Sequence, residues 1–184
     1  MNLTGKMLIA MPGMGDVRFE HSVVYMCRHD DKGAMGLVVN KPTAGLTLGD
    51  LLKQLDLDVG NFSGDGPVLF GGPVEGSRGF ILHSCDYKLN LKTLTIPDSL
   101  CMTATIDVLG DIALGRGPKS ALLMLGYAGW GPGQLEQEIT MNGWLTCEAS
   151  EHLVFDCAHA EKWTKALQSL GVDPLTLSAS AGHA

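Results

Sequence analysis

The spacing of apolar residues along this chain changes between that of a strand and that of a helix. This pattern predicts short strands mixed with short helices. Two β-branched and aromatic runs, Ser22 to His29 and Ala34 to Asn40, flank the tetrapeptide Asp30-Asp31-Lys32-Gly33. Aspartate and glycine favour tight turns, so these runs predict a hairpin with a four-residue loop. The other expected strands are Lys6 to Met11, Pro67 to Phe70, Gly79 to His83, Leu91 to Ile96, Lys119 to Leu125 and Leu153 to Phe155.

Helical spacing of apolar residues predicts four helices. In the first, Leu46 to Leu57, Thr47 and Asp50 form a variant of the capping box. The last, Ala160 to Leu170, would bury Trp163, Ala166, Leu167 and Leu170 and end at Gly171. The other two are expected at Ile106 to Leu114 and at Gly133 to Met141. The predicted fold class is mixed α+β, a three-layer arrangement of a mixed, mostly antiparallel sheet with helices on both faces.

Length and composition fit one soluble domain. The 184 residues, 45% of them hydrophobic, can fill a single core, with a possible small subdomain within residues 61–96. The apolar run Met7 to Met11 is too short for a signal peptide, and no run approaches a membrane span of about 18 residues. We therefore expect a cytoplasmic protein. Its five cysteines include no C-x-x-C pair and indicate no disulfide framework: Cys27, Cys85, Cys101, Cys147 and Cys157.

Charge bears on the class of partner. The chain has 13 basic and 20 acidic residues, and the basic residues are scattered singly. Binding to a phosphate backbone depends on clustered lysine and arginine, so direct nucleic-acid binding is disfavoured. A small anionic ligand or a protein partner remains as the expected partner, and the oligomeric state stays open.

Three long ordered strings extend along nearly the whole chain. They centre on Leu8-Ile9-Ala10-Met11-Pro12 through Gly33-Ala34-Met35-Gly36-Leu37-Val38-Val39-Asn40-Lys41-Pro42, on Gly71-Gly72-Pro73-Val74 with Arg78-Gly79-Phe80-Ile81-Leu82-His83, and on Leu125-Gly126-Tyr127-Ala128-Gly129-Trp130 with Gly133-Gln134-Leu135-Glu136. In these strings the chain resembles the AlgH family. The resemblance implies a three-layer α/β fold with a small inserted α/β portion. The family is often labelled a transcriptional regulator, and the resemblance brings no catalytic residues with it.

The string from Gly126 to Gly133 lies between an apolar strand and a helix. Free backbone N–H groups at a helix start attract anions, so this turn predicts a pocket for a phosphate or carboxylate, walled by Tyr127 and Trp130. Pro132 removes one donor, and the string matches neither the Walker A pattern nor the dinucleotide fingerprint. A tight turn without a ligand is the alternative.

Polar side chains beside apolar runs are the expected lining of a cleft. Caps, ion pairs and strand-end hydrogen bonds are the alternative explanation for several of them. On the next helix, Gln134, Glu138 and Asn142 share one side and predict either a solvated face or a partner surface. The candidate ligand-binding residues are Asp16, His29, Asn40, Arg78, His83, Tyr127, Trp130 and Gln134.

Two chemical alternatives come from the hairpin strand. Cys27 and His29 lie two apart, which would place them on one strand face, with Ser22 on the other. A hydrolase or transferase could use Cys27 with His29, or Ser22, although no third orienting group is evident. Cys27 and His29 could also join His83 and Cys85 around zinc, but their separation gives no support for a metal site. We therefore predict no metal and no cofactor, and a non-enzymatic binding or regulatory protein.

Overall fold

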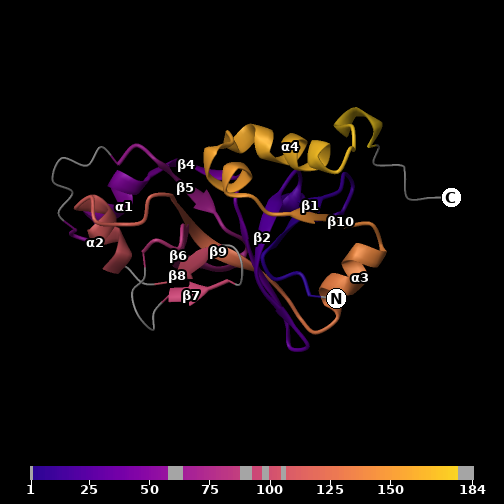
Figure 1. The fold of residues 1–184 in the computed structure, drawn as a ribbon, viewed down its shortest axis with the longest axis horizontal. Helices are drawn as coiled ribbons and strands as arrows, with labels where there is room; N and C mark the ends of the chain where they lie inside the picture. The colour runs from indigo at the N-terminus through magenta and orange to yellow at the C-terminus, as the bar shows by residue number, and fades with distance from the viewer. Residues whose placement is uncertain (1, 58–63, 88–92, 97–99, 105–106, 178–184) are drawn as a thin grey trace.

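Within its described residues the chain forms a ten-stranded, mostly antiparallel sheet with four short α-helices (Figure 1). The structure, a computed structural model, describes residues 2–57, 64–87, 93–96, 100–104 and 107–177. The strands are β1 (Lys6–Ala10), β2 (Val23–Asp30), β3 (Gly33–Val38), β4 (Pro42–Thr47), β5 (Pro67–Phe70), β6 (Val74–His83), β7 (Thr93–Thr95), β8 (Cys101–Thr103), β9 (Ala121–Trp130) and β10 (Trp144–Glu148). The helices are α1 (Leu48–Gln54), α2 (Asp107–Ala113), α3 (Gln134–Thr140) and α4 (Lys162–Ser169).

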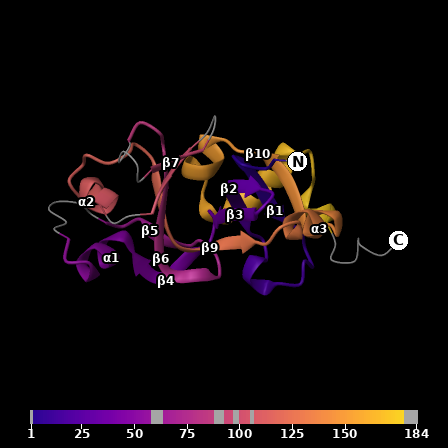
Figure 2. The same ribbon diagram turned by 90° about the horizontal axis from the view of Figure 1, so that it is seen from below.

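Strand β9 connects the two ends of the molecule. The sheet order is β10-β1-β2-β3-β9-β6-β8-β7, and β5 joins β9 as the parallel pair while also pairing with β4. Figures 1 and 2 show α1 and α2 at one end of this sheet and α3 and α4 at the other. The predicted mixed, mostly antiparallel sheet is confirmed as a curled sheet of the α+β class with few helices. The three-layer arrangement and the small inserted portion stay predictions, as does the division into domains.

The first three strands bury both of their faces. Alternate residues of β1 to β3, among them Ile9, Tyr25 and Leu37, pack with Trp163 and Leu167 of α4 on what we call the α4 face. The intervening residues pack with α3 on the α3 face, in a cluster that includes Leu8, Val24, Val38, Trp130, Leu135 and Trp144. This alternation, which a bulge at Cys27 of β2 interrupts, follows from the period of two in a strand, and each face receives its own helix.

Several predicted elements are confirmed. The hairpin of β2 and β3 forms, and its Gly33 has a φ of 127°. The predicted four-residue loop is wrong, because Asp30 and Gly33 pair with each other and leave a loop of Asp31 and Lys32. The capping box of α1 is present, because Thr47 accepts from the Asp50 amide while the Asp50 carboxylate accepts from the Thr47 amide. Helix α4 buries Trp163, Ala166 and Leu167 as expected, but Leu170 follows the helix and is 41% exposed, so its predicted burial is wrong.

Other expectations need correction. Leu153 to Phe155 is not a strand but part of a π-helical turn at His152–Asp156. Three short strands, β4, β8 and β10, were not expected, since none has a clear apolar alternation. The expected strand Leu91 to Ile96 lies partly outside the described residues, and Thr93–Thr95 forms β7.

The glycine-rich string after Leu125 is largely strand rather than turn. Strand β9 continues to Trp130. The turn that was predicted to bind an anion before the helix is therefore shorter and starts at Gly131. The glycines of this string allow the backbone just before β6 to cross very close to the backbone of β9. A Cβ on Gly72 would lie 2.1 Å from the Tyr127 carbonyl carbon, and one on Gly126 would lie 2.4 Å from the Gly72 oxygen. At this crossing the start of β6 lies against the last part of β9.

Helix α4 is anchored by a buried lysine. Lys162 is fully buried, and its Nζ donates to the carbonyl oxygens of Val39 at 2.9 Å and Val154 at 2.6 Å. Burial lowers the pKa of Lys162 from 10.5 to about 8, a change that the neighbouring Cys157 partly opposes. Between these two values the unfolded chain binds more protons than the folded chain, so the Lys162 contribution to stability rises with pH there and is constant below pH 8.

We therefore expect the stability advantage of the wild type over Lys162→Met to grow between about pH 8 and about pH 10. Urea unfolding at several pH values measures this difference, and the subtraction removes the titration of other groups. The control is Lys165→Met, which alters an exposed lysine of the same helix paired with Glu161. A difference for Lys162→Met that does not change across this range would contradict the assignment.

Two further findings concern cysteines and membranes. Cys85 and Cys101 form a disulfide between the end of β6 and the start of β8, which the cysteine spacing did not indicate. Cys27, Cys147 and Cys157 are free and buried, as expected of small apolar side chains. Among the described helices, none has the length and apolar character that a membrane crossing requires.

Candidate functional site

Two adjoining hollows lie where β9 meets β3 and the start of β6. The larger, of about 940 Å³, lies beside α3 and the segment from Met11 to Phe19, and we call it the α3 hollow. The smaller, of about 450 Å³, contains Arg28 and Arg78, and we call it the arginine hollow. Both volumes are in the range of small-molecule sites. The two share Val74, Gly129 and Trp130.

An aromatic cluster forms one wall of the α3 hollow. Phe19 stacks on Trp130 with a centroid distance of 6.5 Å and meets Trp144 edge-on at 5.5 Å. The two indoles are themselves edge-on at 5.9 Å. These arrangements are the ones that aromatic quadrupoles favour. Trp144 lies behind this wall, because the residues lining the hollow include Phe19 and Trp130 but not Trp144.

A single carboxylate ties this cluster to α3. One oxygen of Glu138 accepts from the indole N–H of Trp130 at 2.9 Å and of Trp144 at 2.8 Å. Its other oxygen accepts from the Gln134 amide at 2.9 Å, and the Gln134 oxygen accepts from the Gly131 amide at 3.0 Å. Glu138 therefore fixes both indole rings and lines the hollow itself.

Asp16 and Arg18 also line the α3 hollow. Asp16 caps the 3-10 turn Val17–Phe19 by accepting from the Arg18 amide. The Arg18 guanidinium donates to both Asp16 oxygens, the shortest contact being 2.7 Å. These hydrogen bonds lower the pKa of Asp16, so the pair stays ionised and its two charges compensate each other.

The charged residues that line the arginine hollow, among those that the structure describes, are two arginines. Arg28 and Arg78 lie on its rim, and among the described residues no carboxylate lines it. The Arg78 guanidinium lies 5.1 Å from the centre of the Phe80 ring, which Tyr127 meets edge-on at 5.7 Å. The remaining wall is apolar, with Met35 and Met102 beside Trp130. A β-bulge at Cys27 turns Arg28 toward this side of the sheet, opposite Met35.

The structure brings five of the predicted site residues to these hollows. Asp16, Trp130 and Gln134 line the α3 hollow, while Arg78 and Tyr127 line the arginine hollow with Trp130. A single cleft was expected, and the structure has two hollows that meet at Trp130.

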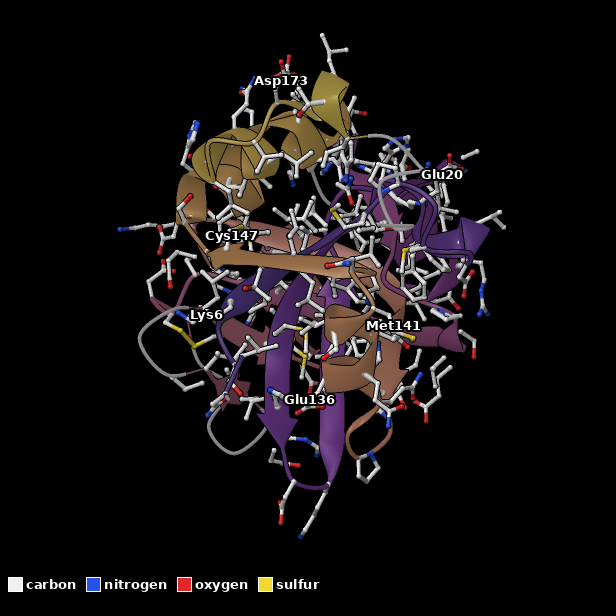
Figure 3. All side chains as sticks on the ribbon, turned by 90° about the vertical axis from the view of Figure 1, so that its right-hand side faces the viewer. Lys6, Glu20, Glu136, Met141, Cys147 and Asp173 are labelled. Atoms are coloured by element: carbon white, nitrogen blue, oxygen red, sulfur yellow. A yellow bond between two sulfur atoms is a disulfide. The ribbon has the colours of Figure 1, made fainter. Side chains whose placement is uncertain are left out.

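The other three predicted residues do not line either hollow. His29 is buried, accepts from the Leu3 amide at 3.1 Å through Nδ1 and contacts Glu136 at 2.8 Å through Nε2. Figure 3 shows Glu136 on α3 beside the β2–β3 hairpin. Since Nδ1 accepts, Nε2 carries the proton and donates to Glu136.

Asn40 and His83 have bonding partners inside the fold. The Asn40 side chain accepts from the Val23 amide and donates to the His21 carbonyl, both at 2.8 Å, which joins β2 to the end of β3. His83 is fully buried between the Ser84 carbonyl and the Thr103 hydroxyl, each 2.9 Å away. Burial lowers the pKa of His83.

The expectation that Cys27 and His29 share a strand face is wrong. The pairing of β2 with β3 shifts between Met26 and Arg28, so the extra residue Cys27 breaks the alternation. Cys27 belongs to the α4 face, whereas His29 bonds to Glu136 of α3. Burial also raises the pKa of Cys27 to about 12. This thiol therefore lacks both a base and the thiolate form that a nucleophile requires.

The structure also disfavours the other two chemical hypotheses, a Ser22 nucleophile and a zinc site. Ser22 is completely buried, so its hydroxyl is closed to a substrate. Cys85 is held in the disulfide with Cys101, which removes it from the four-residue zinc hypothesis. Among the residues that the structure describes, no group of three or more His, Cys, Asp or Glu side chains is placed to hold a metal.

Sequence reasoning missed two residues with prominent positions. Arg28 follows the bulged Cys27, and no pattern in the sequence marks that bulge. Glu138 did carry a signal, because it lies four residues after Gln134 on the polar side of α3. The sequence pattern predicts a solvated or partner-binding face there, whereas Gln134 and Glu138 bond to each other and fix two indoles.

These features define an α+β protein with two surface hollows that differ in their charged lining residues and share one buried tryptophan. A family profile described as AlgH-like matches residues 7–175. A UPF0301 protein of Ruegeria pomeroyi is 57% identical over 185 residues, covering 100% of each chain. One of Paracoccus denitrificans is 55% identical, covering 100% of this chain and 97% of the relative. The chain belongs to the AlgH-like family.

Solved structures agree with this membership. The solution structure of the AlgH protein from Pseudomonas aeruginosa has a TM-score of 0.82 and 42% identity, covering 100% of this chain and 97% of that one. A crystal structure of a protein from Corynebacterium diphtheriae has a TM-score of 0.73 at 18% identity, covering 95% of this chain and 89% of that one. The second likeness concerns the fold alone.

Proposed function

We propose that this chain is a non-enzymatic cytoplasmic binding or regulatory protein that takes a small anionic ligand in the arginine hollow. The observation that carries the proposal is the pair Arg28 and Arg78 on the rim of one concave site. Guanidinium groups bind carboxylates and phosphates through paired N–H donors. With no lining carboxylate among the described residues, this hollow favours an anion over a cation.

Both arginines can give donors to a ligand. Arg78 pairs with Glu75 at 2.9 Å, and Arg28 pairs with Asp30 at 3.4 Å. All four side chains are at least 40% exposed. Exposed ion pairs contribute about 0–1 kcal/mol, so a ligand can share or replace them at small cost. Each guanidinium also has more donors than one carboxylate uses.

The walls favour an anion that carries a flat or apolar part. Tyr127, which Phe80 supports edge-on, offers ring surface on one side, and the thioethers of Met35 and Met102 offer adaptable apolar contact. A volume of about 450 Å³ suits a ligand of nucleotide size or smaller. A coenzyme fragment or an aromatic acid has this combination of properties.

A thermal-shift screen with nucleotides, coenzymes and aromatic or aliphatic acids tests the proposal. A ligand at about 100 times its Kd stabilises the native state by about 2.7 kcal/mol. For a chain of this length, that stabilisation corresponds to a rise in Tm of roughly 5–10 °C. If no anion in the screen raises the Tm, the proposal fails, and a protein partner becomes the better hypothesis.

For any anion that binds, Arg28→Gln and Arg78→Gln should each weaken binding roughly tenfold or more. Hydrogen bonds to charged groups contribute about 1.5–3 kcal/mol. The matched control is Arg116→Gln, because Arg116 is also an exposed arginine paired with a carboxylate, that of Asp111, and lines neither hollow. Calorimetric titration measures the three affinities. Equal losses in all three variants, or no loss at either Arg28 or Arg78, would contradict the assignment.

A further inference from the structure

The charged residues that line the α3 hollow differ from those of the arginine hollow. Its charged lining residues among the described part of the chain are Asp16, Arg18 and Glu138. Since Arg18 donates to both oxygens of Asp16, those two charges compensate each other. Glu138 remains, and its contacts with Trp130, Trp144 and Gln134 are all with neutral donors.

Neutral donors hold a carboxylate in place without cancelling its charge. Among the described residues, Glu138 forms no salt bridge, and the last turn of α3 has no basic residue that could supply a cation. The hollow therefore contains a fixed, partly buried anionic group without a positive partner. Such a group attracts a cation more strongly than an exposed carboxylate does, because solvent screens it less.

We propose that the α3 hollow is a second binding site, and that its ligand is an organic ammonium or guanidinium carried on an apolar or aromatic group. The cationic end would lie near Glu138 and the ring surface of Phe19 and Trp130 that lines the hollow, where cation–π attraction adds to the ion pairing. The apolar part would contact the thioethers of Met11, Met14 and Met141, which adapt to varied shapes.

The wall composition agrees with this class of ligand. The hollow is large, and Met141 at its rim is 73% exposed, so a ligand can reach the site without rearrangement of the core. Figure 3 shows Met141 close to α3. Among the described residues, the lining of this hollow includes one cation, Arg18, against the two arginines that line the arginine hollow, so it offers a small anion fewer donors.

The test compares 2-phenylethylamine with 3-phenylpropionate. Both carry a phenyl ring on a short chain, and they differ in the sign of the charge at neutral pH. Titration of ¹⁵N-labelled protein follows the indole N–H signals of its three tryptophans. We expect the amine to shift the signals of Trp130 and Trp144, and to leave that of Trp163, which donates to the Ala10 carbonyl in the core. The acid should leave the Trp144 signal in place, whereas it can shift that of Trp130, which also lines the arginine hollow.

Two variants make the result specific. Glu138→Gln keeps the shape of the side chain and should weaken amine binding by about tenfold. Met141→Lys places a cation on the rim without touching the core, and should weaken it severalfold by repulsion. Its control is Leu114→Lys, at a position after α2 that is 56% exposed and lines neither hollow.

The outcomes are decisive for this proposal alone. A Trp144 shift by the acid equal to that by the amine, no Trp144 shift by either compound, or unchanged amine affinity in Met141→Lys would each overturn it. The anionic ligand of the arginine hollow is followed separately, through a Tm that depends on Arg28 and Arg78. A negative result for one hollow therefore does not contradict the proposal for the other.

Discussion

Replacing Gly72 by alanine should prevent the chain from folding, or cost more than about 4 kcal/mol of stability. A Cβ at this position would lie 2.1 Å from the Tyr127 carbonyl carbon and 2.3 Å from the Ala128 nitrogen. Both are backbone atoms of β9, so no side chain can rotate away to relieve the contact. The φ of Gly72 is also 152°, at the edge of a region that alanine rarely adopts.

The matched controls are two glycines with open surroundings. A Cβ added to Gly76 in β6 or to Gly110 in α2 would meet nothing within 4 Å, and neither glycine has a positive φ. Gly76→Ala should be close to neutral, and Gly110→Ala should stabilise α2 by about 0.5–1 kcal/mol, because alanine favours helix. Yield of soluble protein and urea unfolding measure all three variants. A Gly72→Ala protein that unfolds within about 1 kcal/mol of the wild type would contradict the crossing.

The crossing explains why the glycine-rich string could be found in the sequence but not interpreted from it. Glycines that bind a ligand and glycines that admit another backbone give the same local pattern. What distinguishes them here is the partner Gly71-Gly72, more than fifty residues earlier in the chain, whose contact with Gly126 depends on the sheet order. Local elements such as the hairpin and the Thr47 capping box could be predicted, because their signals lie within a few residues.

The candidate site shows the same division between local and long-range information. Trp130 and Tyr127 could be predicted from their place beside an apolar strand, and Arg78 from its place before another. The Cys27 bulge could not, since it depends on how β3 pairs with β2, and one extra residue moved His29 to the face opposite Cys27. That single shift separates the proposed nucleophile from its base.

Replacing Glu138 by alanine should cost about 2–5 kcal/mol of stability, although the side chain is only partly buried. The substitution leaves the indole N–H groups of Trp130 and Trp144 without their acceptor. Trp130 is 7% exposed and Trp144 is 2% exposed, so water replaces the lost acceptor poorly. Each buried donor left unsatisfied costs about 1–3 kcal/mol. Gln134 also loses an acceptor, but it is exposed and can bond to water.

Glu138→Gln should fall between the wild type and alanine, at about 1–2 kcal/mol. The amide oxygen can still accept from both indoles, but its nitrogen then faces the donating Gln134 amide, whose own oxygen is bonded to Gly131. The control is Glu148→Ala, since Glu148 is 82% exposed and pairs with Lys6 at the surface, where an ion pair contributes less than about 1 kcal/mol. Urea unfolding followed by tryptophan fluorescence reports both stability and the packing of the indoles. If Glu138→Ala costs no more than Glu148→Ala, the carboxylate does not fix the two rings, and the wall of the α3 hollow is held by packing alone.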